Sequence, residues 1–250
     1  MKTSTKIFIA ALVFLVLCIG GYDLLLKKEF LTGRYKNYYS HFTPLPYKDF
    51  DALEINAAHK ASVEVVQGPF GVKADPNILD YVQFTQKGGL LQMNIQYNTN
   101  RFYNDENYRI IISCPSLSSV TANAFIVINK QRVIDTTTND NWNYGKIMIN
   151  GFKQDSLVIS QDYGSQVVLA NNNIGLLNAT VGLSPFSGSH ITILKNNRFN
   201  VAKLQLLNKS TLNLNEAKIN QLDYRPGDST RLIINGAAKN SLLPYIHLKQ

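Results

Sequence analysis

The chain has little charge and little cysteine. Asp, Glu, Lys and Arg make up 17% of its 250 residues, against roughly a quarter in typical soluble domains. Coiled coils and long helical bundles are rich in Glu, Lys, Arg and Ala, so this composition disfavours both. Two cysteines, Cys18 and Cys114, provide no disulfide or zinc framework. We expect Cys114 to be a small core residue.

Recognisable catalytic and cofactor motifs are also lacking. The four histidines, His41, His59, His190 and His247, are far apart in sequence, and none has the spacing of a metal site. The sequence contains no P-loop, no dinucleotide fingerprint and no nucleophile elbow. We therefore expect no cofactor, no metal site and no catalytic residues, and we expect the protein not to be an enzyme.

Positive charge is in excess but dispersed. The formal net charge is +8, and the lysines and arginines occur singly apart from Lys27 and Lys28. No nucleic-acid-binding motif accompanies them, so no nucleic-acid partner is expected. A basic surface of this kind is either simply solvated or attracts polyanions such as acidic glycans and lipid head groups.

The residues that are present indicate a β protein. Apolar residues reach 45%, enough to bury a core and to exclude wholesale disorder. Asparagine is abundant, and it favours turns because it tolerates left-handed backbone and hydrogen-bonds to its own turn. The composition predicts a turn-rich, all-β domain.

The N-terminus carries the strongest local signal. Residues 7–26 are almost entirely apolar, interrupted only by Asp23, and Lys2 and Lys6 precede them. A membrane span needs about 20 apolar residues, whereas the core of a secretory signal has about 7–15. We expect residues 1–6 to form a short cytoplasmic tail and 7–26 an uncleaved signal anchor. A cleaved signal peptide is the alternative.

Either outcome exports the rest of the chain. The expected location is the cell envelope, as a single-pass membrane protein with its C-terminal domain outside the cytoplasm, or secreted or periplasmic if the signal is cleaved. Residues 27–47 are aromatic-rich around Pro44 and Pro46, and we interpret them as a linker to a domain over 48–250.

Short strands recur with a fixed period in the second half. One apolar residue from each strand gives the series Ile126, Ile147, Val167, Ile191, Leu212 and Leu232, with successive offsets of 21, 20, 24, 21 and 20. A second series, Leu157, Leu177, Val201, Leu222 and Leu242, has offsets of 20, 24, 21 and 20. Both series lengthen at the same repeat. This pattern predicts a single-stranded, right-handed β-solenoid with about twenty residues per turn and two or three strands in each turn.

Periodic asparagines accompany the strands. Asn129, Asn150, Asn171, Asn215 and Asn235 each follow a strand of the first series. In a stacked coil such residues can hydrogen-bond from turn to turn as a ladder. They can also be independent turn formers. The period favours the ladder.

The first half contains longer strands with alternating apolar residues, separated by Gly- and Pro-containing turns. The segments Phe50–Ile55, Ala61–Gly68, Gly88–Ile95, Arg109–Ile112 and Pro115–Leu117 resemble the auto-transporter adhesin head GIN domain family, a bacterial domain of unknown function. The resemblance covers roughly residues 48–245. It implies an exported β-solenoid-like domain with a surface or adhesive role.

Two aromatic residues are the candidate interaction surface. Trp142, the only tryptophan, and Tyr144 lie in a polar excursion between strands, where they could stack on a sugar or anchor a partner. Trp142 could equally fold back over the core. The expected partners are the membrane and a surface glycan or another envelope protein.

The leading hypothesis is a non-enzymatic, envelope-anchored β-solenoid with an interaction, adhesion or structural role. One alternative is a glycan-binding or polysaccharide-cleaving β-helix, although its candidate acids Asp155, Asp162, Asp223 and Asp228 form no convincing pair. Another alternative is the ectodomain of an envelope sensor or anti-sigma-type partner.

Overall fold

The computed structural model describes residues 3–33, 39–97, 108–136 and 145–236. The chain consists of two compact units, Met1–Phe42 and Thr43–Gln250. Trp142 and Tyr144, the predicted interaction residues, lie outside the described residues.

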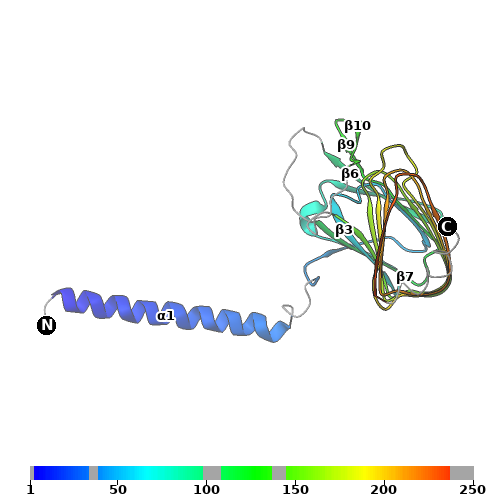
Figure 1. The fold of residues 1–250 in the computed structure, drawn as a ribbon. Helices are drawn as coiled ribbons and strands as arrows, with labels where there is room; N and C mark the ends of the chain where they lie inside the picture. The colour runs from blue at the N-terminus through cyan, green and yellow to red at the C-terminus, as the bar shows by residue number, and fades with distance from the viewer. Residues whose placement is uncertain (1–2, 34–38, 98–107, 137–144, 237–250) are drawn as a thin grey trace. The chain divides into compact units, whose positions relative to one another are not determined.

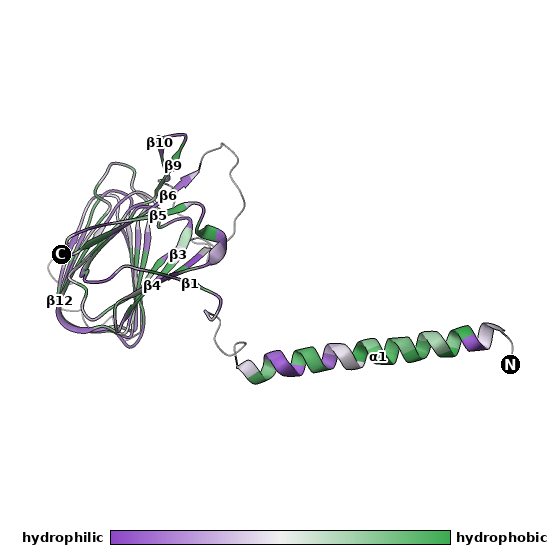
Figure 2. Cartoon of the chain, turned by 180° about the vertical axis from the view of Figure 1, so that it is seen from behind, coloured by the Kyte–Doolittle hydropathy of each residue, from purple (hydrophilic) through white to green (hydrophobic). Residues whose placement is uncertain are grey.

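The first unit contains one helix. Helix α1 spans Thr3–Thr32, and its mean hydropathy of 2.4 makes it long and apolar enough to cross a membrane. An α-helix of this length extends about 45 Å, which exceeds the hydrocarbon core of a bilayer. Its apolar residues occupy most of the helix, with polar residues at its ends (Figure 2). The helix extends past the expected span of residues 7–26 on both sides.

The second unit is built almost entirely of strands. Among the described residues the strands form two mixed sheets, one of nine and one of ten strands. The nine-stranded sheet contains, in spatial order, β1 (Thr43–Leu45), β4 (Gly71–Ala74), β7 (Tyr108–Cys114), β3 (Ala61–Gln67), β11 (Ile147–Asn150), β13 (Gln166–Ala170), β15 (His190–Ile193), β17 (Thr211–Asn215) and β19 (Arg231–Asn235).

The ten-stranded sheet contains, in spatial order, β10 (Gln131–Ile134), β9 (Phe125–Ile128), β6 (Leu90–Tyr97), β2 (Ala52–Ile55), β8 (Ser119–Ala122), β12 (Lys153–Gln161), β14 (Asn173–Val181), β16 (Arg198–Leu206) and β18 (Lys218–Pro226). Strand β5 (Val82–Lys87) pairs antiparallel with β6, and a short 3-10 helix, η2, spans Pro76–Ile78. Strand β1 lies within the stretch expected to be a linker.

From β11 onward the chain visits the two sheets alternately. Each strand pairs in parallel with the strand two places later, so these strands stack side by side (Figure 1). In the nine-stranded sheet the residues in register are Ile147, Val167, Ile191, Leu212 and Leu232, and their numbers increase in steps of 20, 24, 21 and 20. The sequence period therefore marks real strand-to-strand pairing.

The two periodic series need two corrections. In the ten-stranded sheet Leu177 pairs with Ala202, and Leu176 pairs with Val201, so the predicted position of Val201 is one residue out of register. The turn between β15 and β16 is longer than its neighbours, and this moves β16 along the sequence. The inclusion of Ile126 is also wrong, because β9 belongs to the ten-stranded sheet and β11 instead pairs with β3.

Alternation of side chains creates the core. In strands such as β8 and β15 every second residue is buried, and Ile191, Leu212 and Cys114 are all fully inaccessible. The expectation that Cys114 is a core residue is confirmed. Burying a leucine or isoleucine side chain stabilises the fold by about 1.5–3 kcal/mol, so this periodic apolar stripe is the main stabilising feature of the regular half.

The predicted asparagine ladder is present in part. Asn171 donates to Oδ1 of Asn150 at 2.9 Å, but this pair is exposed. Asn129 lies instead in the β9–β10 hairpin, where it and Lys130 both have positive φ, as a two-residue type I′ turn requires. Asn150 and Asn171 also occupy different positions in their turns, because Asn150 pairs with Ala170.

A buried ladder lies one position further on. The Asn172 amide donates to the carbonyl oxygen of Ile149 and to Oδ1 of Asn197, and its own Oδ1 accepts from the N–H of Phe152. Asn197 continues the ladder by donating to the carbonyl oxygens of Leu169 and Leu194 at 2.7 Å. Both asparagines are almost completely buried, so these bonds satisfy main-chain groups that water cannot reach.

Candidate functional site

The outer face of β12, β14, β16 and β18 is largely polar. Strand alternation turns the buried residues inward and leaves a second set on this face. Parallel pairing aligns that set in rows, so Val158, Asn178, Lys203 and Asp223 form one row. The next row contains Ser160, Thr180, Gln205 and Arg225. Residues that are one repeat apart in sequence are thereby brought side by side.

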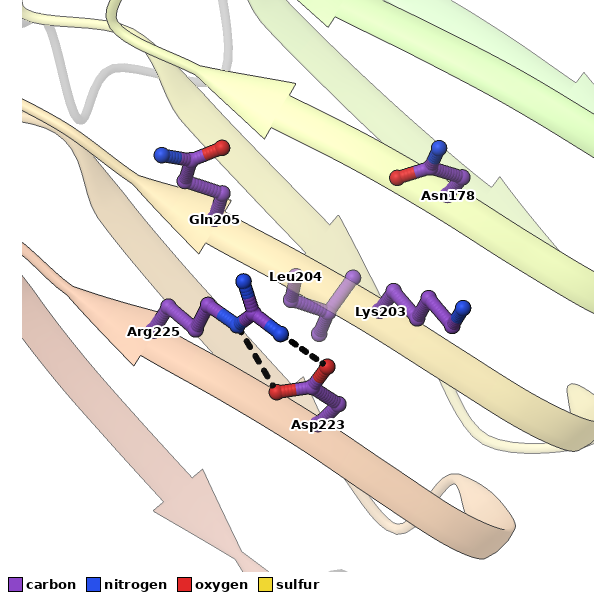
Figure 3. A pocket seen from close by; sticks show the side chains of 6 residues that line it. All are labelled: Asn178, Lys203, Leu204, Gln205, Asp223 and Arg225. Carbon is purple, nitrogen blue, oxygen red and sulfur yellow. Dashed lines mark hydrogen bonds and ion pairs between the residues drawn. The ribbon is translucent and has the colours of Figure 1, made fainter.

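A shallow hollow of about 210 Å³ lies on this face. Its lining residues are Asn178 from β14, Lys203, Leu204 and Gln205 from β16, and Asp223 and Arg225 from β18 (Figure 3). Leu204 is buried beneath the strand, whereas the amides and the lysine are exposed.

An ion pair holds two of the charged side chains of the hollow in place. Arg225 donates from Nε and one terminal nitrogen to the two carboxylate oxygens of Asp223, at 3.2 and 3.1 Å. This two-bond geometry fixes the guanidinium plane. Lys203 forms no ion pair with any described residue, so its ammonium group is available to a ligand. The hollow suits a hydrogen-bonding ligand that carries negative charge.

The candidate acids do not come together as a catalytic pair. Asp162, in the turn after β12, accepts hydrogen bonds from the N–H groups of Tyr163 and Ser184 and from the Ser184 hydroxyl. Asp228 follows β18, three strand positions away in the stacking order. That separation is about 14 Å at the usual strand spacing, beyond the roughly 5–9.5 Å that glycoside hydrolysis uses.

Two buried groups have shifted pKa values. Burial lowers the pKa of His59 to about 4, with Asp135 opposing the shift and Lys60 adding to it. Burial, with a smaller contribution from Asp51, raises the pKa of the Cys114 thiol to about 12. His59 is therefore neutral and Cys114 protonated near neutral pH. Within the described residues, no three His, Cys, Asp or Glu side chains group together as metal ligands.

The residues of the hollow are not among those that the sequence singles out. Polar residues that alternate outward on a strand carry no motif, and nothing distinguishes Lys203 from any other exposed lysine. The repeat period could have found them, since Asn178, Lys203 and Asp223 occupy equivalent positions in three successive strands. The register error at Val201 hides this alignment.

Comparison with known proteins supports the fold. No protein-family model matches the chain, so the resemblance to the head GIN domain family has no support from such a match. No curated protein matches it either. A crystal structure of a "putative adhesin" from Parabacteroides distasonis is similar to this chain with a TM-score of 0.55 at 13% sequence identity, covering 77% of this chain and 71% of the other.

Two further solved structures are more distant. A "putative adhesin" from Bacteroides fragilis has a TM-score of 0.41 at 14% identity, covering 78% of this chain and 96% of its own. A "putative lipid binding protein" from Parabacteroides distasonis has a TM-score of 0.27 at 12% identity, covering 78% and 95%. Neither of these two likenesses is strong enough to support an argument. The first structure, with its TM-score of 0.55, shows that the chain shares its fold with a Bacteroidetes protein that is called an adhesin.

Proposed function

We propose that this protein is a non-enzymatic, envelope-anchored β-solenoid that binds an acidic surface glycan through the outer face of β14, β16 and β18. The observation that carries the proposal is the hollow, in which Lys203 and Arg225 stand beside the amides of Asn178 and Gln205. Amides and cations together can hydrogen-bond hydroxyl groups and pair with carboxylates or sulfates.

Strand order supports the solenoid. Successive strands from β11 to β19 enter the two sheets alternately, and the chain returns to each sheet one repeat later, next to the strand it left. A chain that repeats this path winds as a coil with two strands per turn. Parallel strands joined through a crossover are right-handed in about 98% of cases, which supports the right-handed form.

Helix α1 supports the envelope location. It is the single helix among the described residues that is apolar and long enough to span a membrane. A secretory signal sequence passes the same test, so the mass of the mature chain decides between an anchor and a cleaved signal. Both outcomes place the β domain outside the cytoplasm.

Carboxylate geometry supports a binding role over a cleaving one. The hollow contains a single carboxylate, Asp223, and Arg225 pairs with both of its oxygens. Glycoside hydrolysis uses two carboxyl groups, one of which must donate a proton to the leaving oxygen. A carboxylate that already accepts two hydrogen bonds from a guanidinium is poorly placed for that role.

The experiment is a glycan array probed with the full chain in detergent. We expect acidic glycans to be retained, in a salt-sensitive manner. Lys203→Glu should reduce that signal by about tenfold or more, because it places a like charge against the ligand. Lys73→Glu is the matched control, since Lys73 is an exposed lysine on β4 of the other sheet, and it should bind normally.

Three outcomes would contradict the proposal. Retention of no glycan removes the ligand class, and equal losses from Lys203→Glu and Lys73→Glu remove the site. Release of reducing ends from a retained glycan would instead establish the polysaccharide-cleaving alternative.

A further inference from the structure

The loop between β14 and β15 is longer than the connection between the two sheets requires. The equivalent turns after β12, β16 and β18 each have four residues, whereas this loop, Gly182–Ser189, has eight. The shorter turns show that the chain can pass between the sheets without the extra length. The insertion therefore needs an explanation other than connecting two strands.

Hydrogen bonds brace the base of the loop against the neighbouring turns. Ser184 bonds to the Asp162 carboxylate through both its N–H and its hydroxyl. The Ser187 hydroxyl donates to the carbonyl oxygen of Tyr163 at 2.9 Å. Gly182, at φ +86°, packs so closely on the carbonyl oxygen of Leu207 that a Cβ could not be accommodated. The loop is thus held in a fixed position.

The outer part of the loop displays large apolar side chains. Phe186 is 70% exposed and Leu183 is 51% exposed. Phe186 also has a positive φ of 63°, which is unusual for a bulky residue and marks a strained backbone position. A braced loop that holds two such side chains in water is a candidate docking element.

Cationic and further apolar side chains lie at the same end of the domain as this loop. The ammonium group of Lys209 lies 5.5 Å from the centre of the Phe186 ring. Arg132 of the β9–β10 hairpin donates to the hydroxyl of Tyr163, the residue whose carbonyl oxygen accepts from Ser187 of the loop. Val133 and Ile134 of the same hairpin are 40% and 45% exposed. The hairpin and the yellow-green loop lie at the same end of the strands (Figure 1).

We propose that the Gly182–Ser189 loop inserts Phe186 and Leu183 into the interface of an anionic bilayer. Exposed aromatic and aliphatic side chains enter the boundary between head groups and acyl chains, and adjacent cations pair with anionic head groups. The same chain contains a membrane-length helix, so a bilayer is the surface that the β domain meets at the highest local concentration. The hollow proposed to bind glycan lies on the outer face of the strands, towards the C-terminal ends of β16 and β18, and the contact proposed here uses none of its lining residues.

The test uses the full chain reconstituted in vesicles through α1. Trp142→Phe removes the native tryptophan, and Phe186→Trp then places a fluorescent reporter on the loop. Vesicles contain phosphatidylcholine and phosphatidylglycerol with or without bromine on the acyl chains, which quenches tryptophan on contact. We expect brominated lipid to lower Trp emission at position 186 by about twofold, with a blue shift that reports an apolar environment. Omitting phosphatidylglycerol, or adding Lys209→Glu, should weaken the quenching.

Val158→Trp in the same background is the matched control. Val158 is 44% exposed on the outer face of β12, on a strand rather than on the loop, and it should not be quenched. Leu183→Trp is a second reporter in case Phe186→Trp destabilises the domain. Equal quenching at positions 183, 186 and 158, or none at 183 and 186, would overturn the proposal. A blue shift that instead grows with protein density in unbrominated vesicles would assign the loop to a second copy of the chain.

Discussion

The two halves of the β domain use different kinds of pairing. Strands β11–β19 pair with one another only in parallel, and each partner is the strand one repeat away. Strands β1–β10 mix hairpins with pairings over long distances. Leu53 of β2, for example, pairs with Val120 of β8, and Val63 of β3 pairs with Ile147 of β11. The regular half repeats one local rule, whereas the first half depends on contacts that no short stretch of sequence encodes.

This difference indicates how each half is stabilised. In the regular half, core side chains have equivalents beside them in the neighbouring strands. A destabilising substitution at one position therefore weakens the packing against both neighbouring strands, as in other repeat architectures. In the first half, individual turns and buried polar groups determine the local structure. The predictions below test that contrast.

The largest effect is expected in the regular core. Leu212 is fully buried and pairs with Ile191 and Leu232 in the adjacent strands. Leu212→Ala should lower the free energy of unfolding by about 2–5 kcal/mol, and Leu212→Asp should prevent folding because it buries an unpaired charge. Denaturant unfolding measures both variants. Val158→Ala, at an exposed strand position, should change stability by less than about 0.5 kcal/mol, and equal losses at the two sites would refute the assignment of faces.

The next largest effect is expected at the buried ladder. Asn172→Ala leaves the N–H of Phe152 and the carbonyl oxygen of Ile149 without their side-chain partner, at a cost of about 1–3 kcal/mol for each group. Asn150→Ala removes the exposed bond from Asn171 and a long, 3.5 Å bond to Glu64, and it should cost about 0.5 kcal/mol or less. The double variant Asn172→Ala with Asn197→Ala should cost less than the sum of the two single variants. Strict additivity in thermal unfolding would show that the asparagines act independently.

In the irregular half we expect stability to depend on pH through His59. Burial lowers its pKa in the folded state to about 4, from 6.5 in the unfolded state. The unfolded state therefore binds more protons, and stability is complete above pH 6.5 and declines as the pH falls towards 4. From pH 7 to pH 5 the loss should be about 2 kcal/mol. His59→Gln should remove this dependence, and an unchanged pH profile in that variant would show that other groups are responsible.

The smallest effect on stability is expected at the proposed binding face. The ion pair between Arg225 and Asp223 is exposed, with side-chain exposures of 74% and 35%. Such pairs contribute about 0–1 kcal/mol, so Arg225→Ala should leave the unfolding midpoint nearly unchanged while it weakens glycan binding. A large loss of stability would mean that the pair is structural and that its effect on binding is indirect.

Sequence reasoning succeeds where the structure is periodic. The repeat of apolar residues identifies the strands from β11 onward, and Ile147, Val167, Ile191, Leu212 and Leu232 are in register as expected. It fails where one inserted residue or one hairpin changes the register, as at Val201 and Ile126. The buried ladder escapes it because Asn172 and Asn171 are indistinguishable by type, and burial alone separates them.

The candidate site is less predictable than the fold. Trp142 and Tyr144 stand out by their chemistry, but they lie outside the described residues, and that prediction remains untested. To recognise the hollow and the Gly182–Ser189 loop, one must know which side chains face outward and which of them stay exposed to solvent. Composition cannot show either property, although the extra length of the loop is visible as the longer step from Val167 to Ile191.

Disulfide trapping tests the alternating, in-register path most directly. With Cys18→Ser in the background, cysteines at Asn178 and Lys203 probe one sheet, and cysteines at Thr192 and Asn213 probe the other. Registered residues on adjacent strands lie about 5 Å apart, within disulfide range, whereas Asn178 and Gln205 lie about 8 Å apart and outside it. Peptide mass spectrometry after mild oxidation should find both registered pairs linked, and cysteines at Asn178 and Gln205 unlinked. Efficient linkage of that off-register pair, or failure of the registered pair in either sheet, would contradict the proposed coil.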